Sequence, residues 1–223
     1  MQTTLAITLR IRPFREYDRM ITLYTKDYGK LVVVGRGMQK VRSKLAGHLR
    51  EGMLSSVTFV HGKRFDTITA AQIEQSFPTI RNNLQRLAVA SALLEHYDRW
   101  MKEDFTDLPA WELLVDSLMA LEAGVPPMVV RWAFPLRSLS LLGWHLRFDD
   151  DRGAGKIEVG NQKWEVTPEQ RSALMTLQQQ PYQEIPIRVL QSRTIQNIIR
   201  SYLLFHREWD SKVERWGQWA FTQ

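Results

Sequence analysis

The residues of this chain best suited to do chemistry are cations gathered near its start. Between Lys30 and Arg64 there are eight Lys and Arg and a single acid, Glu51. Up to Arg64 the chain holds 13 Lys and Arg against 4 Asp and Glu, whereas the rest of the chain holds 17 against 20. A dense group of guanidinium and ammonium ions attracts a polyanion. The pattern therefore favours nucleic acid as the partner of the first part of the chain.

The densest part of this run is the stretch GRGMQKVRSKLAGHLR, residues 35–50, which is expected to connect two strands. Cations on a loop at the mouth of a barrel can follow a phosphate backbone without reading its sequence. The plain alternative is a solvated loop that only keeps the chain soluble, but the density of cations against one acid favours contact with nucleic acid. Six aromatic residues nearby could stack on bases, although such rings more often fill the core of a small barrel: Phe14, Tyr17, Tyr24, Tyr28, Phe59 and Phe65.

Motifs of the common catalytic sites are missing from this sequence. It contains no cysteine, its five histidines fall in no zinc-binding spacing, and neither GxSxG nor GxxxxGK[ST] occurs. Gly35 and Gly37 lack the further glycine of a dinucleotide-binding turn. The acidic run Asp149 to Asp151 could bind Mg²⁺ in a nuclease, but a solvated loop is favoured because adjacent carboxylates point in different directions. We expect no enzymatic turnover, no cofactor and no metal.

The elements that must carry the cations are strands. Leu5, Ile7, Leu9 and Ile11 alternate with less apolar residues and predict a half-buried first strand that Pro13 ends. Four further β-rich runs follow, at residues 20–25, 31–34, 53–60 and 65–73, and Gly29 lies in the turn of the first hairpin. Five short strands with one long basic loop predict a small closed barrel of the OB type over residues 1–78.

From residue 79 the apolar residues recur at helical spacing. Three helices are expected around residues 80–97, 111–121 and 129–142, followed by a loop or small hairpin insertion at about 149–166. Thr167 and Gln170 predict a capping box, and a last helix runs from about Ile187 or Thr194 to Trp209 or beyond. The fold class is α+β, with a helical domain over residues 79–223.

The chain has 44% hydrophobic and 24% charged residues, which is ordinary for a soluble globular protein. The first residues, MQTTLAITLRIRPF, carry arginines inside the apolar stretch and do not resemble a signal peptide. No run approaches the apolar length of a membrane span. We expect a cytoplasmic protein that works at the nucleoid and does not enter a membrane.

Several ordered blocks of sequence resemble the bacterial recombination mediator family RecO. In the first part they are EYDRMITLYTKDYGKLVVVGRG, residues 16–37, and VRSKLAGHL, residues 41–49; later come WELLVDSL, VVRWAFPLRSLSLLGW and NIIRSYLLFH. The resemblance spans nearly the whole chain. It implies a DNA repair protein with an N-terminal OB barrel, a helical domain and no turnover.

The resemblance also implies partners and sites. Members of the family bind single- and double-stranded DNA, anneal complementary strands and work with RecR to load RecA onto DNA coated by single-strand-binding protein. The DNA-contacting surface would correspond here to Arg19, Lys30, Arg36, Lys40, Arg42, Lys44 and Arg50. Some members bind the acidic tail of single-strand-binding protein in the helical region, and an apolar groove flanked by Arg131 and Arg137 would be its place here.

The sequence departs from the family at one point. Many relatives carry a four-cysteine zinc module after the helix that here ends in Leu142-Gly143-Trp144, and this chain has no cysteine there. We therefore expect a shortened, metal-free insertion. The alternative function is a protein adaptor that is tethered to DNA by its basic barrel and does not anneal strands.

Overall fold

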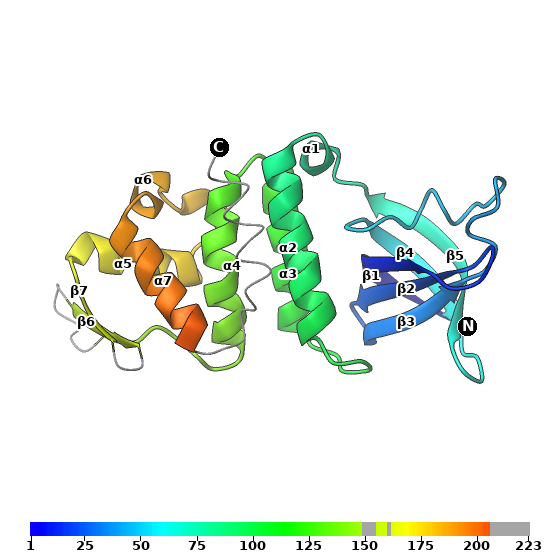
Figure 1. The fold of residues 1–223 in the computed structure, drawn as a ribbon, viewed down its shortest axis with the longest axis horizontal. Helices are drawn as coiled ribbons and strands as arrows, with labels where there is room; N and C mark the ends of the chain where they lie inside the picture. The colour runs from blue at the N-terminus through cyan, green and yellow to red at the C-terminus, as the bar shows by residue number, and fades with distance from the viewer. Residues whose placement is uncertain (149–154, 160–161, 206–223) are drawn as a thin grey trace. The chain divides into compact units, whose positions relative to one another are not determined.

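The computed structural model describes residues 1–148, 155–159 and 162–205, which divide into two compact units. The first unit comprises residues 1–82 and 90–115, and the second comprises residues 83–89 and the chain from residue 116 onward. The first unit contains a barrel and the second is largely helical (Figure 1). This confirms the predicted α+β class.

The barrel is closed by five strands in the order β1-β2-β3-β5-β4 (Figure 1). They are β1 (Gln2–Pro13), β2 (Arg19–Thr25), β3 (Gly29–Gly35), β4 (Leu54–Val60) and β5 (Asp66–Gln75). Every neighbouring pair is antiparallel except β3 and β5, which pair in parallel at Val33–Asp66 and Val34–Thr67. The predicted OB-type barrel is therefore confirmed, because this short parallel pairing is what closes the sheet on itself.

Strand β1 is covered on both faces and is not half-buried as the alternation predicted. Ala6 belongs to the apolar core of the barrel, while Ile7 pairs with Tyr24 of β2 and so lies on the same outer face as that ring. Tyr24 packs against Tyr97 at 5.0 Å and Trp111 at 6.2 Å between ring centroids. Helical residues of the same unit thus cover an outer face of the barrel, and a period-two pattern alone does not distinguish one covered face from two.

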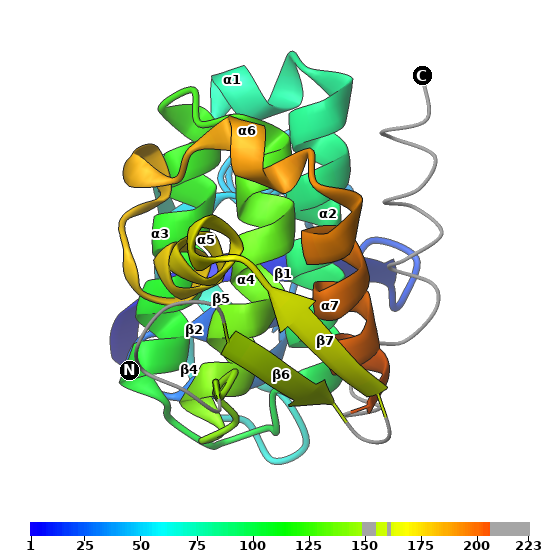
Figure 2. The ribbon, with the colours of Figure 1, turned by 90° about the vertical axis from the view of Figure 1, so that its left-hand side faces the viewer.

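Most of the elements after the barrel are helices. The first three are α1 (Pro78–Arg81), α2 (Leu84–Trp100) and α3 (Leu108–Glu122). In the second unit α4 (Pro127–Leu141) lies against α5 (Pro168–Gln179) and α7 (Arg193–Phe205), and α6 (Ile187–Leu190) with a short 3₁₀ turn (Tyr182–Glu184) connects α5 to α7 (Figure 2). Of the two expected starts of the last helix, Thr194 agrees with α7, which begins at Arg193, whereas the stretch from Ile187 forms the separate helix α6. The expected extension to Trp209 lies outside the described residues.

The second unit also contains a two-stranded insertion and a capped helix, as the sequence predicts. The insertion is a hairpin of β6 (Gly155–Val159) and β7 (Gln162–Val166), which lies beside α7 and α5. The capping box is present, since Gln170 N donates to Thr167 Oγ1 at 3.3 Å and Thr167 N donates to Gln170 Oε1 at 3.0 Å. These contacts satisfy backbone donors that the first turn of α5 would leave without partners.

Candidate nucleic-acid interface

Residues 36–50, here called the basic segment, are fastened to the barrel by two buried side chains. Met38 and Leu49 lie in the barrel core, 7% and 1% exposed. The backbone N of Gly37 donates to Asp18 Oδ1 at 2.8 Å, and Ser55 Oγ donates to the carbonyl oxygen of His48 at 2.7 Å. The segment is thus held at both ends, which fixes the positions from which its cations extend.

Five of the predicted DNA-contacting residues share this segment and point into solvent. All are exposed: Arg36, Lys40, Arg42, Lys44 and Arg50. Lys40 Nζ lies 5.5 Å from the centre of the exposed Tyr17 ring. Exposed cations fixed on one segment can neutralise successive phosphates of a nucleic acid backbone.

Arg19 joins the basic segment from the neighbouring strand β2. It is half-buried and lines a hollow of about 610 Å³ together with Ile11, Met38, Leu49 and Arg50. The walls of one hollow therefore contain both Arg19 and Arg50 together with several apolar side chains. This arrangement offers both charge for phosphates and an apolar surface for bases or sugars.

Arg81, just beyond the barrel, adds a cation that the sequence prediction missed. It donates from Nη2 to the carbonyl oxygen of Glu51 at 3.1 Å and from Nε to that of Ser76 at 2.9 Å. Burial, and secondarily the positive charge of Arg50, lowers the pKa of Arg81. The dense run of cations in the sequence ends at Arg64. The fold brings Arg81 back to the end of the basic segment, where it contacts Glu51.

Lys30 lies in different surroundings from the other predicted cations. Its side chain is 12% exposed; Nζ donates to the carbonyl oxygen of Asp98 and lies 3.7 Å from Asp98 Oδ1. Asp98 Oδ2 also accepts from Arg10 at 3.3 Å. These contacts connect β3 and β1 with α2 inside the first unit, so the structure assigns Lys30 a packing contact as well as a place near the barrel surface.

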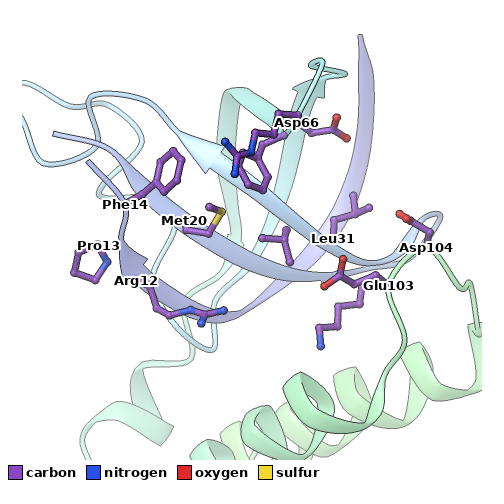
Figure 3. A pocket seen from close by; sticks show the side chains of 12 residues that line it. Arg12, Pro13, Phe14, Met20, Leu31, Asp66, Glu103 and Asp104 are labelled. Carbon is purple, nitrogen blue, oxygen red and sulfur yellow. The ribbon is translucent and has the colours of Figure 1, made fainter. Parts of the chain in front are cut away.

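The six aromatic residues near the basic run separate into two groups. Tyr24 and Phe59 are fully buried, and Tyr28 packs edge-on against Phe59 with centroids 5.4 Å apart. Phe14 and Phe65 are only half-buried and meet edge to face, with centroids 5.7 Å apart. They line a second hollow, on the other side of β2 and β3 from the barrel interior (Figure 3). With the exposed Tyr17 beside Lys40, three of the six rings are therefore available beside cations at the surface.

The barrel and the helical part of the chain each match a known protein family. Residues 1–77 match the family described as Recombination protein O N terminal, and residues 81–212 match Recombination protein O C terminal. The chain belongs to the RecO family. The resemblance found in the sequence is thereby confirmed.

Curated RecO relatives are similar over most of the chain. The DNA repair protein RecO of Dehalococcoides mccartyi is 34% identical over 141 residues, which are 63% of this chain and 56% of the relative. The DNA repair protein RecO of Moorella thermoacetica is 30% identical over 168 residues, which are 75% of this chain and 62% of the relative. The chain therefore spans less than two thirds of the length of these relatives.

The two arginines that the RecO resemblance suggested for partner binding have unlike surroundings in the helical unit. Arg137 is partly buried against Tyr182, 4.0 Å from the ring centre, and its guanidinium donates to the carbonyl oxygens of Leu177, at 2.9 Å, and Gln180. Burial lowers the pKa of Arg137. Arg131 lies over Trp132 at 5.1 Å from the ring centre, and Arg200 of α7 lies over the same ring at 5.7 Å. The structure therefore places Arg200 with Arg131, and gives Arg137 a role in joining α4 to the end of α5.

Within residues 1–148, 155–159 and 162–205, no three His, Asp or Glu side chains gather as metal ligands would. The acidic run Asp149 to Asp151 lies outside the described residues. Among the described helices, none has the length and apolar character needed to cross a bilayer.

Proposed function

We propose that this chain acts in DNA repair as a recombination mediator that binds single- and double-stranded DNA through backbone phosphates and anneals complementary strands. Together with RecR it would load RecA onto DNA coated by single-strand-binding protein, and the helical unit would receive the acidic tail of that protein. Family membership supports the repair role, and the excess of cations in the part of the chain up to Arg64 supports DNA as the direct partner.

The observation that carries the proposal is the basic segment itself. Five exposed cations extend from a segment whose Met38 and Leu49 are anchored in the barrel core. Because these cations are presented in a fixed arrangement and read no base edges, binding is expected to be independent of sequence. Screening two phosphate backbones lets complementary strands approach, and base pairing then supplies the free energy, so no nucleotide is needed.

The test is annealing of complementary oligonucleotides without nucleotide, over a series of salt concentrations, with and without single-strand-binding protein. We expect annealing to be accelerated on bare and on protein-coated strands, and the acceleration to fade as salt rises. Tight binding without annealing would contradict the mediator proposal and leave the adaptor as the better account.

A triple substitution of Arg42, Lys44 and Arg50 to alanine is expected to weaken binding to single and double strands about tenfold or more, to a similar extent for all sequences. The matched control removes three exposed cations of the second unit, Lys156, Arg188 and Arg193, and should leave both affinities nearly unchanged. Equal losses in the two variants would show that only total charge matters and would overturn the assignment of the site. Fluorescence anisotropy with labelled oligonucleotides measures both affinities.

A further inference from the structure

The connection between β1 and β2, residues 14–18, meets the start of the basic segment. It forms a turn, because the backbone N of Phe14 donates to the carbonyl oxygen of Asp18 at 3.3 Å. The backbone of the segment is bonded to this connection, since the backbone N of Gln39 donates to the carbonyl oxygen of Tyr17 at 3.0 Å. The connection therefore supports the segment near its beginning.

One side chain of the connection adds to this support. Asp18 is half-buried, and its Oδ1 accepts from the backbone N of Gly37 at 2.8 Å. Gly37 has φ of 62°, in the left-handed region, and its carbonyl oxygen accepts from the backbone N of Lys40 at 3.0 Å. A hydrogen bond from a backbone N–H to a carboxylate is stronger than one between neutral groups. Asp18 therefore fixes the tight turn with which the segment begins.

A cation lies on each side of this turn. Arg36 precedes Gly37 and Lys40 ends the turn, and both side chains are exposed. The backbone angles between the two residues decide where their charges lie, so a turn with several conformations would spread those charges over a larger volume. Cations that are already in place lose less conformational entropy when they bind phosphates. The turn held by Asp18 thus prepares two cations for a nucleic acid backbone.

The charge of Asp18 by itself would have the opposite effect. Between Arg10 and Lys26 the chain has five cations, and its two acids there are Glu16 and Asp18. A carboxylate close to a DNA-binding surface repels phosphates. If net charge alone decided affinity, removing Asp18 would tighten binding, whereas the hydrogen bond to Gly37 leads to the opposite expectation.

From this geometry we propose that Asp18 is a positioning residue for DNA binding. Its carboxylate holds the turn at Gly37 so that Arg36 and Lys40 meet the same phosphate backbone as the rest of the basic segment. The inference rests on the proposed function, which it deepens by giving a negatively charged side chain a favourable part in binding a polyanion.

The first test compares three variants that each remove one negative charge from the connection. Asp18→Ala also removes the acceptor, Asp18→Asn keeps an oxygen in its place, and Glu16→Gln changes an exposed side chain two residues away. Asp18→Ala should raise the Kd for a labelled 30-nucleotide single strand about three- to tenfold, although the chain becomes more positive. Asp18→Asn and Glu16→Gln should bind as tightly as the original chain or up to about twofold more tightly. Tighter binding by all three variants would show that only net charge matters and would overturn the inference.

A second test separates positioning from a general loss of stability. Asp18→Ala is combined with the double change Arg36→Gln and Lys40→Gln. In that background Asp18→Ala should change the Kd less than about twofold, because the cations it would misplace are already gone. Combined with Lys44→Gln, farther along the segment, it should weaken binding as much as in the original chain. Equal weakening in both backgrounds would contradict positioning of the two cations.

Hydrogen exchange distinguishes failure of this inference from failure of the proposed function, because it needs no DNA. In Asp18→Ala the amide of Gly37 should exchange about tenfold faster or more, while the amide of Ile21, fully buried in β2 between two paired strands, keeps its rate. Unchanged exchange at Gly37 would overturn the inference whatever the DNA affinity.

The basic-segment variant at Arg42, Lys44 and Arg50 completes the comparison. If it loses DNA binding while Asp18→Ala binds as the original chain does, the inference alone is wrong. If Gly37 exchanges faster and yet neither variant binds DNA more weakly, the basic segment is not the interface, and the proposed function fails together with the inference.

Discussion

At the scale of single residues, two cations of the same short stretch of sequence have different tasks because of their surroundings. Lys30 is 12% exposed and contacts Asp98. Arg42 is exposed on the basic segment. The two positions look equally basic in the sequence, and the difference comes from Asp98, 68 residues away. A charge that is already paired and partly desolvated contributes less to binding a phosphate than one in solvent.

Replacing Lys30 with methionine should therefore lower stability, by about 1–3 kcal/mol, because Asp98 loses a partner in a partly buried place. The affinity for single-stranded DNA should change little. Arg42→Met is the matched control, for which we expect the reverse: unchanged stability and weaker binding. Urea unfolding and anisotropy titrations measure the two effects. A Lys30 variant with normal stability and lost DNA binding would make Lys30 a direct contact.

At the scale of elements, the β2–β3 hairpin depends on a close approach of backbone to backbone. Gly29 has φ of 65°, in the left-handed region, and a methyl group added there would collide with the carbonyl oxygen of Phe105. The same hairpin holds Asp104, which borders the second hollow, because the backbone N of Asp104 donates to the carbonyl oxygen of Lys30. The turn therefore sets the position of this carboxylate as well as the register of two strands.

Gly29→Ala should consequently destabilise the chain by about 2 kcal/mol or more, the combined cost of a left-handed alanine and a displaced Phe105. Gly47→Ala is its control, because a Cβ at Gly47 would meet no atom within 4 Å and Gly47 has no positive φ. The midpoint of urea unfolding compares the two. Equal midpoints would contradict the close approach at Phe105.

At the scale of the whole molecule, positive charge belongs to the barrel. The part of the chain up to Arg64 has 13 cations against 4 acids, and the part after it has 17 cations against 20 acids. Residues 1–77, which contain the whole barrel, hold 13 cations against 6 acids, so the formal net charge of +6 for the chain understates the attraction of the barrel for DNA. Binding should depend on salt through the barrel, whatever the helical unit contacts.

If five or six phosphates are neutralised, the logarithm of affinity for single strands should fall with the logarithm of salt with a slope of roughly −4. The Arg42, Lys44 and Arg50 variant should show a slope smaller by about 2, since three contacts are lost. The control variant at Lys156, Arg188 and Arg193 should keep the original slope. A slope that is the same for all three proteins would mean that the basic segment makes no phosphate contacts.

The sequence by itself determined the barrel, the helices and the place of the basic segment. These follow from local signals: the period of two in β1, the turn at Gly29, the capping box at Thr167 and the density of cations after Lys30. Each signal acts over a few residues and needs no knowledge of the rest of the chain.

Only the tertiary structure decided which residues meet. In the structure Tyr24, which pairs with Ile7 of β1, packs against Tyr97 of α2 on the outer face of the barrel. Lys30 contacts Asp98, and Phe14 contacts Phe65, although the two residues of each pair lie far apart in the sequence. Barrel closure and helix packing create these contacts between segments distant in the chain. The pattern of one sequence records burial and charge at each position but not the identity of a distant neighbour, because many arrangements of the same strands would satisfy the same pattern.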